Sequence, residues 1–98
     1  MENVFQALAD PTRRKILQML NDGDKSAGEI AAAFNMTAPS ISHHLNVLKK
    51  AELVTTHRNK QSIIYALNTT VVQEFLQVLL GIFQVGEGES KKEGYDVE

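Results

Sequence analysis

Residues 26–54 contain two short amphipathic segments joined by a polar break, and they constrain the fold more than any other stretch. Ser26 and Glu29 have the spacing of a capping box, which marks the start of a helix. In the second segment the apolar residues recur with helical periodicity. These residues are Ile41, Leu45 and Leu48. Two short helices separated by a tight turn predict a helix-turn-helix.

The second segment, over 37–51, keeps one helical face polar. Thr37 has the chemistry of an N-cap, and Pro39 is tolerated in a first helical turn. A helix with an apolar back and a small, polar and basic front suits the major groove of DNA, so we interpret it as a recognition helix. Its outward positions are Pro39, His43, Asn46, Val47 and Lys50, with Ser40 and Ser42 on the shoulders.

A β-hairpin is predicted directly after this helix, over 53–67, because β-branched residues flank a polar turn. The turn is expected at Asn59–Lys60, which places Arg58, Asn59 and Lys60 at the tip of the hairpin. A basic hairpin in this position is typical of a wing that contacts a neighbouring phosphate strand or the minor groove, although an ordinary solvated turn would also be polar. The predicted fold is mainly α with a β-hairpin wing (α+β), a winged helix-turn-helix.

The formal net charge of −2 is unevenly distributed. Residues 86–98 hold five acidic residues and two lysines, whereas residues 36–64 hold four basic residues and one acidic residue. Charges act locally, within a Debye length of about 8 Å, so the basic region remains compatible with nucleic acid. We predict a DNA-binding and dimerisation domain over 1–85 and a disordered acidic tail over 86–98.

The last predicted helix, over 69–84, is apolar around more than half of its circumference. A surface helix needs only one apolar stripe, and the surplus predicts a second buried face against a partner subunit. A short amphipathic helix over 2–9 is expected to join it. The predicted dimer interface consists of Val4, Phe5, Leu8, Val72, Phe75, Leu76, Leu79 and Phe83.

Three cations, Arg13, Arg14 and Lys15, crowd the first turns of the helix that follows Asp10 and Pro11. The helix dipole disfavours cations there by about 0.3–1 kcal/mol each. We expect an ion pair with Asp10 or with another helix to offset this effect; a phosphate contact is the alternative.

Several function classes are disfavoured by what the sequence lacks. It contains no cysteine, which excludes disulfides and thiolate metal sites. No signal peptide and no apolar stretch long enough to span a bilayer is visible, so a cytoplasmic protein without direct membrane insertion is expected. Ser40 and His44 are one helical turn apart, but no nearby acid would orient the histidine, and we predict no catalysis. A winged helix that binds protein would carry apolar residues in place of the polar front.

The segments Leu8–Leu17 and Ser40–Ala51 together resemble the ArsR/SmtB family of winged-helix bacterial repressors, over roughly residues 4–84. Within the family the chain is most similar to the SdpR-type autorepressors, through Pro39–Asn46 and Tyr65–Thr70. The resemblance implies a homodimer that binds an imperfect inverted repeat in double-stranded DNA and represses transcription. By analogy, the base-reading positions are Ala38, Pro39, Ser40, Ser42 and His43.

Two departures from the family pattern are visible. Glu52 stands where many relatives have glycine, so the end of the recognition helix is expected to be satisfied differently, and Ala38 stands where glutamine is frequent. Metal-sensing relatives place ligands on the helix matching 26–34 or on the last helix; here the first offers only Glu29, and the last has no histidine or aspartate. We therefore predict no metal and no cofactor, with a metal- or ligand-responsive repressor as the alternative, and expect the protein level or a partner protein to control repression.

Overall fold

The computed structural model describes residues 1–84, and along them five helices alternate with a small three-stranded sheet. The predicted tail at 86–98 lies outside the described residues. The elements are α1 Glu2–Leu8, α2 Pro11–Asn21, β1 Lys25–Ser26, α3 Ala27–Ala32, α4 Ala38–Lys50, β2 Val54–Asn59, β3 Ser62–Leu67 and α5 Thr69–Phe83. This order confirms the predicted winged helix-turn-helix.

Side-chain caps begin four of the helices. The Asp10 carboxylate accepts from two main-chain N–H groups of the first turn of α2, and Thr37 Oγ1 accepts from the Ser40 N–H in α4. Ser26 and Glu29 form the predicted capping box of α3, with distances of 2.8 and 3.1 Å. Asn68 caps α5. Because these bonds satisfy otherwise unpaired donors, the helix starts can be read from local sequence.

The sheet has the order β1-β3-β2 and is antiparallel throughout. β2 and β3 form the wing, in register from the pair of Val54 and Leu67 to the pair of Asn59 and Ser62. The short strand β1 was absent from the sequence prediction, because two residues are too few to show a periodicity. It pairs with Tyr65 and Ile64 in β3 and so attaches the helix-turn-helix to the wing.

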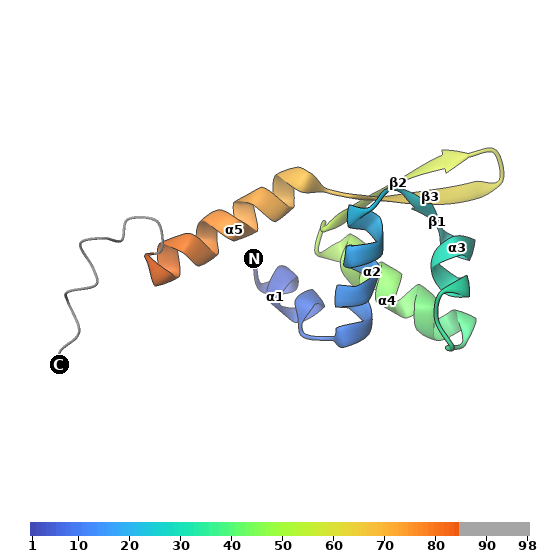
Figure 1. Cartoon of the computed structure of the whole chain (residues 1–98), viewed down its shortest axis with the longest axis horizontal. Helices are drawn as coiled ribbons and strands as arrows, with labels where there is room; N and C mark the ends of the chain where they lie inside the picture. The colour runs from blue at the N-terminus through green and yellow to red at the C-terminus, as the bar shows by residue number, and fades with distance from the viewer. Residues whose placement is uncertain (85–98) are drawn as a thin grey trace.

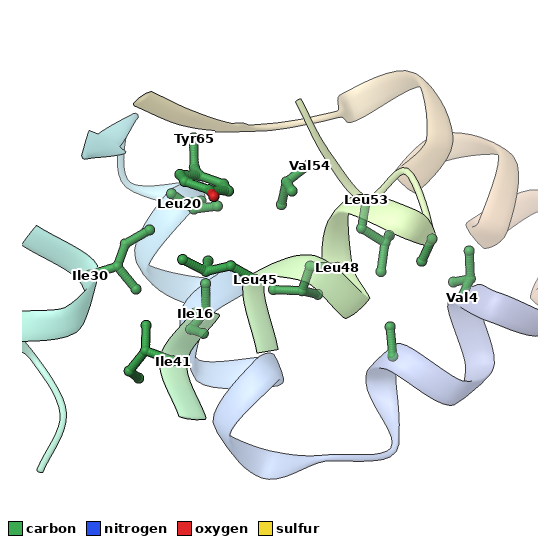
Figure 2. Close-up of a cluster of buried hydrophobic side chains, with 12 residues drawn as sticks. Val4, Ile16, Leu20, Ile30, Ile41, Leu45, Leu48, Leu53, Val54 and Tyr65 are labelled. Carbon is green, nitrogen blue, oxygen red and sulfur yellow. The ribbon is translucent and has the colours of Figure 1, made fainter. Parts of the chain in front are cut away.

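The core lies between the sheet and helices α1, α2, α3 and α4, and its largest fully buried side chains are Ile16, Ile30, Leu48 and Leu53. Figure 2 shows Ile16, Leu45 and Tyr65 among the side chains that fill the space between α2, α4 and the sheet, with Val4 of α1 to one side. The apolar stripe predicted for the recognition helix is buried, with Ile41, Leu45 and Leu48 each at most 4% exposed. Burying this stripe turns the polar face of α4 outward.

Helix α5 and the wing project from opposite sides of this body (Figure 1). None of the residues of α5 is buried in the single chain. Its exposed large side chains include Leu76 at 49%, Ile82 at 60% and Phe83 at 68%. Val71, Val72 and Phe75, in the first half of α5, pack against the core, and the rings of Phe5 and Phe75 meet edge to face with centroids 5.3 Å apart. Most of α5 therefore presents apolar surface without a partner in the chain.

Within residues 1–84, the structure contains no helix long and apolar enough to cross a membrane.

Candidate nucleic-acid interface

The front of α4, the helix that precedes the wing, is an exposed polar face. All seven predicted contact residues are exposed, namely Ala38, Pro39, Ser40, Ser42, His43, Asn46 and Lys50. The first turn is additionally ordered by a hydrogen bond of 3.1 Å from the Thr37 hydroxyl to the Ser40 hydroxyl. The side chains at the start of the helix, Ala38, Pro39 and Ser40, are small and leave its N-terminal turns uncovered.

His44, beside this face, is directed into the protein. Its side chain is only 14% exposed, and its Nδ1 lies 3.1 Å from Arg13 Nη1 and 3.8 Å from Asp10 Oδ2. The Ser40 hydroxyl is instead engaged with Thr37. The serine and histidine therefore have separate structural partners, in agreement with the prediction that they do not form a catalytic pair.

Two of the three cations at the start of α2, Arg13 and Arg14, are stabilised by main-chain carbonyl groups. Arg13 donates from Nε to the Ala7 carbonyl at 2.8 Å and from Nη2 to the Gln6 carbonyl at 3.1 Å. Arg14 donates to the Leu8 carbonyl at 2.8 Å. The expected ion pair is therefore wrong as the main explanation: the guanidinium groups satisfy carbonyls at the C-terminal end of α1, which a helix leaves without internal partners.

Asp10 connects the same junction to the recognition helix. Burial raises the pKa of its carboxyl group, but the Arg13 N–H, the neighbouring His44 and the Thr12 N–H outweigh this effect and hold the pKa below its ordinary value of 3.8. The ionised carboxylate caps α2 with distances of 2.8 and 3.1 Å. α1, α2 and α4 are thereby held together by Asp10, Arg13 and His44.

The wing carries its basic residues at the far end from the core. Arg58, Asn59 and Lys60 are all exposed, as predicted, but the turn itself is Lys60–Gln61, one residue later than expected. The register requires Asn59 to pair with Ser62, which leaves two residues for the turn. Lys60 adopts a φ of 62°, a left-handed conformation that favours glycine.

The recognition helix ends in a Schellman motif. The Leu53 N–H donates to the Leu48 carbonyl at 3.1 Å, and the Glu52 N–H donates to the Lys49 carbonyl at 3.0 Å. Glu52 has a φ of 63°. The expectation that this end differs from a glycine-terminated helix is therefore wrong: Glu52 adopts the left-handed conformation that glycine usually supplies.

The predicted interface residues fall into two groups. Val4 is 3% exposed and belongs to the core of the single chain, so it offers no surface to a partner. Phe5, Leu76 and Phe83 are exposed; the other four, Leu8, Val72, Phe75 and Leu79, are half-buried. A helical face can be read from sequence, but its division between the chain's own core and an outer surface depends on how α1 packs.

Among residues 1–84, no group of three or more His, Cys, Asp or Glu side chains is placed to hold a metal ion. His43 and His44 lie side by side with ring centroids 5.7 Å apart. The Nδ1 atom of His44 is already in contact with Arg13 Nη1, at 3.1 Å.

Residues 10–56 match the profile of the bacterial regulatory proteins of the arsR family. Over 89 residues the chain is 53% identical to the transcriptional repressor SdpR of Bacillus subtilis (strain 168), covering 91% of this chain and 99% of that protein. The chain belongs to the arsR family. The resemblance read from its two sequence segments is thus confirmed.

Further relatives of this arsR-family chain agree. It is 34% identical to the arsenical resistance operon repressor of Staphylococcus xylosus, over 81% of this chain and 72% of that protein. Among solved structures, an ArsR-like transcriptional regulator from Rhodococcus sp. RHA1 has a TM-score of 0.77 and 30% identity, covering 85% of this chain and 78% of that one. The prediction of a DNA-binding transcription regulator, and not an enzyme, is confirmed.

Proposed function

We propose that the chain is a homodimeric repressor that binds an inverted-repeat operator, including one near its own gene, through α4 and the wing of each subunit. The observation that carries this proposal is the outward polar face of α4, whose buried back is fixed to the core while every predicted contact residue remains exposed. The basic end of the β2–β3 hairpin continues this surface toward a neighbouring phosphate strand.

The first turns of α4 are assigned to base reading, through Ala38, Pro39, Ser40 and Ser42. Ser hydroxyls serve either donors or acceptors, and Ala38 and Pro39 suit a thymine methyl group. His43, Asn46 and Lys50 complete the DNA-facing surface. Arg58, Asn59 and Lys60 are assigned to the DNA backbone, because exposed cations at a hairpin end attract phosphate without reading sequence.

The dimer is assigned to α5 and to the exposed part of α1. An isolated 15-residue helix with no buried residue gains little from its own chain. Gly81 lies inside this helix, where it costs about 1 kcal/mol relative to alanine, and a Cβ at this position would meet nothing within 4 Å. Close approach of a partner helix would explain why α5 is stable without buried residues and why a glycine lies inside it.

An apolar groove of about 460 Å³ lies between α2 and the start of α5. Its lining includes Leu8, Leu17, Leu67, Val72 and Phe75. Val72 and Phe75 make the groove continuous with the exposed face of α5, so we assign it to the second copy of the chain. A small apolar inducer competing for the groove would separate the dimer instead.

We propose that operator binding needs no metal or cofactor, since the ligand sets of metal-sensing relatives are missing from the matching positions. Repression would then be relieved by a change in the protein level or by a partner protein.

The direct test is fluorescence anisotropy on a labelled duplex from the promoter of its own gene, with a scrambled duplex of equal length and composition as control. We expect at least about 10³-fold preference for the promoter duplex and two protomers per duplex. Chelator or added zinc should leave the affinity unchanged. Equal binding to both duplexes would refute the proposal, and a change of about tenfold with metal would refute its metal-free part.

A further inference from the structure

A polar groove of about 270 Å³ separates α1 from the recognition helix. Its lining comes from both helices and from the start of α2: Asn3, Gln6, Arg13, His43, Val47 and Lys50. The three residues from α4 are spaced by four and three positions, so they share one helical face. This face is the side of the recognition helix that turns toward α1, next to the positions assigned to base reading.

Arg13 is held rigidly at this groove. Its guanidinium group donates to the carbonyls of Gln6 and Ala7 and contacts His44 Nδ1, at distances of 2.8–3.1 Å. Arginine has five N–H donors, and these contacts engage three of them, which leaves two for a ligand. A guanidinium group fixed in advance loses little side-chain entropy when it binds an anion.

The charge of the groove is one-sided. Arg13 and Lys50 carry positive charge, Asn3 and Gln6 supply amide groups, and no acidic residue belongs to the lining. Asp10, which lies 3.8 Å from His44 Nδ1, is not among the lining residues. Guanidinium, ammonium and amide N–H groups in one concave site are donors suited to a phosphate oxyanion.

We propose that this groove binds one phosphodiester group of the DNA backbone, beside the major groove that α4 enters. The inference rests on the proposed function and extends the DNA contact surface from α4 and the wing to α1. Arg13 and Lys50 donate to the phosphate oxygens, and Asn3 and Gln6 close the groove from α1. The contact sets the position of α4 in the major groove and carries no sequence information.

The proposal gives Arg13 a second role. The same guanidinium group that satisfies the carbonyl end of α1 also faces the phosphate, so the junction of α1, α2 and α4 fixes the distance between the phosphate and the base-reading turns. In a dimer, two such grooves would hold one phosphate in each half-site.

The test replaces an amide in the groove with a carboxylate of nearly the same shape, through Gln6→Glu. Asn3→Asp serves as a second variant. Gln77→Glu is the matched control, because Gln77 is exposed on α5, lies outside both grooves and is not among the predicted interface residues. Gln6 is exposed and its main-chain carbonyl is retained, so Gln6→Glu should melt like the wild type. Affinity is measured by anisotropy on the promoter and scrambled duplexes over a series of salt concentrations.

We expect Gln6→Glu to weaken binding to both duplexes by a similar factor of about ten, and to reduce the slope of log affinity against log salt by about 1 per groove, or about 2 per dimer. Gln77→Glu should bind like the wild type. In a scan of promoter duplexes with single neutral methylphosphonates, one position per half-site should weaken the wild type but not Gln6→Glu.

Each contrary outcome has a distinct meaning. If the wild type fails to bind the promoter duplex, the proposed function itself is wrong. If the wild type binds and both groove variants keep its affinity and salt slope, only the phosphate site is refuted. A changed sequence preference in Gln6→Glu would show base contact instead. Displacement of the promoter duplex by inorganic phosphate at constant ionic strength, abolished by Gln6→Glu, would assign the groove to a free anion and refute the DNA assignment.

Discussion

Replacing Glu52 with glycine should stabilise the protein, although the substitution removes a whole side chain. Glu52 is exposed and holds a φ of 63° in the Schellman motif that ends α4. For an L-residue the left-handed conformation costs about 1–2 kcal/mol, and glycine avoids this strain. Glycine also makes the unfolded chain more flexible, which offsets about 0.5–1 kcal/mol of the gain. The net expected stabilisation is about 0.5–1 kcal/mol.

For a domain of this size, that free energy corresponds to a rise in melting temperature of about 2–8 °C. The assay is thermal and urea unfolding followed by circular dichroism, at one fixed protomer concentration because assembly shifts apparent stability. Glu52→Ala controls for the loss of the carboxylate, since it keeps the strain, and should leave stability nearly unchanged.

Glu74→Gly is the matched control for the glycine itself. Glu74 is exposed inside α5, so the same change there should destabilise by about 1 kcal/mol. Opposite signs for Glu52→Gly and Glu74→Gly would support a left-handed helix end at Glu52. A destabilised Glu52→Gly, or equal effects of the two substitutions, would refute the reasoning.

Three further predictions concern assembly, the wing and acid stability. Leu76→Asp and Phe83→Asp change positions that are exposed in the single chain, so the variants should retain their helix content. They should weaken the dimer by several kcal/mol and abolish specific DNA binding, as measured by sedimentation velocity and anisotropy. A folded monomer with wild-type operator affinity would contradict the dimer assignment. Lys60→Gly should relieve the backbone strain of a φ of 62° and stabilise the fold by up to about 1 kcal/mol. It should nevertheless weaken binding to all duplexes and lower the slope of log affinity against log salt by about 1 per wing. A new sequence preference would argue against a contact with the DNA backbone. Asp10→Ala should cost about 0.5–2 kcal/mol at neutral pH. Because the pKa of Asp10 is lowered in the folded state, its contribution is present above the unfolded pKa and lost as the pH falls through the folded pKa, so urea unfolding below about pH 4 should show the wild type and Asp10→Ala converging.

The parts of the fold that were predictable from sequence depend on short-range rules. The caps at Asp10, Ser26 and Thr37 act within one helical turn, and the buried stripe of α4 follows from helical periodicity. Once this stripe is assigned to the core, the remaining residues of α4 must form its exposed polar face. These features require no knowledge of what packs against them.

The features that were missed depend on tertiary placement. Arg13 and His44 are 31 positions apart, and their contact exists because α1, α2 and α4 meet at one junction. The groove beside α1 has the same origin, and only the basic run after Asp10 hinted at it. Val4 was placed in the interface because periodicity defines a face but not its partner. The sequence places the turn of the wing one residue too early, because no glycine marks it. The pairing of Asn59 with Ser62 sets the register instead.

Glu52 and Lys60, which both adopt the left-handed conformation, lie on either side of β2. Glu52 precedes this strand by two residues and Lys60 follows it directly. The base of β2 is fixed by buried Leu53 and Val54, at 2% and 3% exposure, whereas its other end is exposed. Backbone strain therefore occurs at the points where the chain leaves the recognition helix and where the wing turns, and strain of this kind persists only where the surrounding structure imposes it. At Glu52 the Schellman bonds and the buried Leu53 impose it. At Lys60 only the two-residue turn does, and the proposed phosphate contact at the tip of the wing would account for a lysine where glycine fits the backbone better.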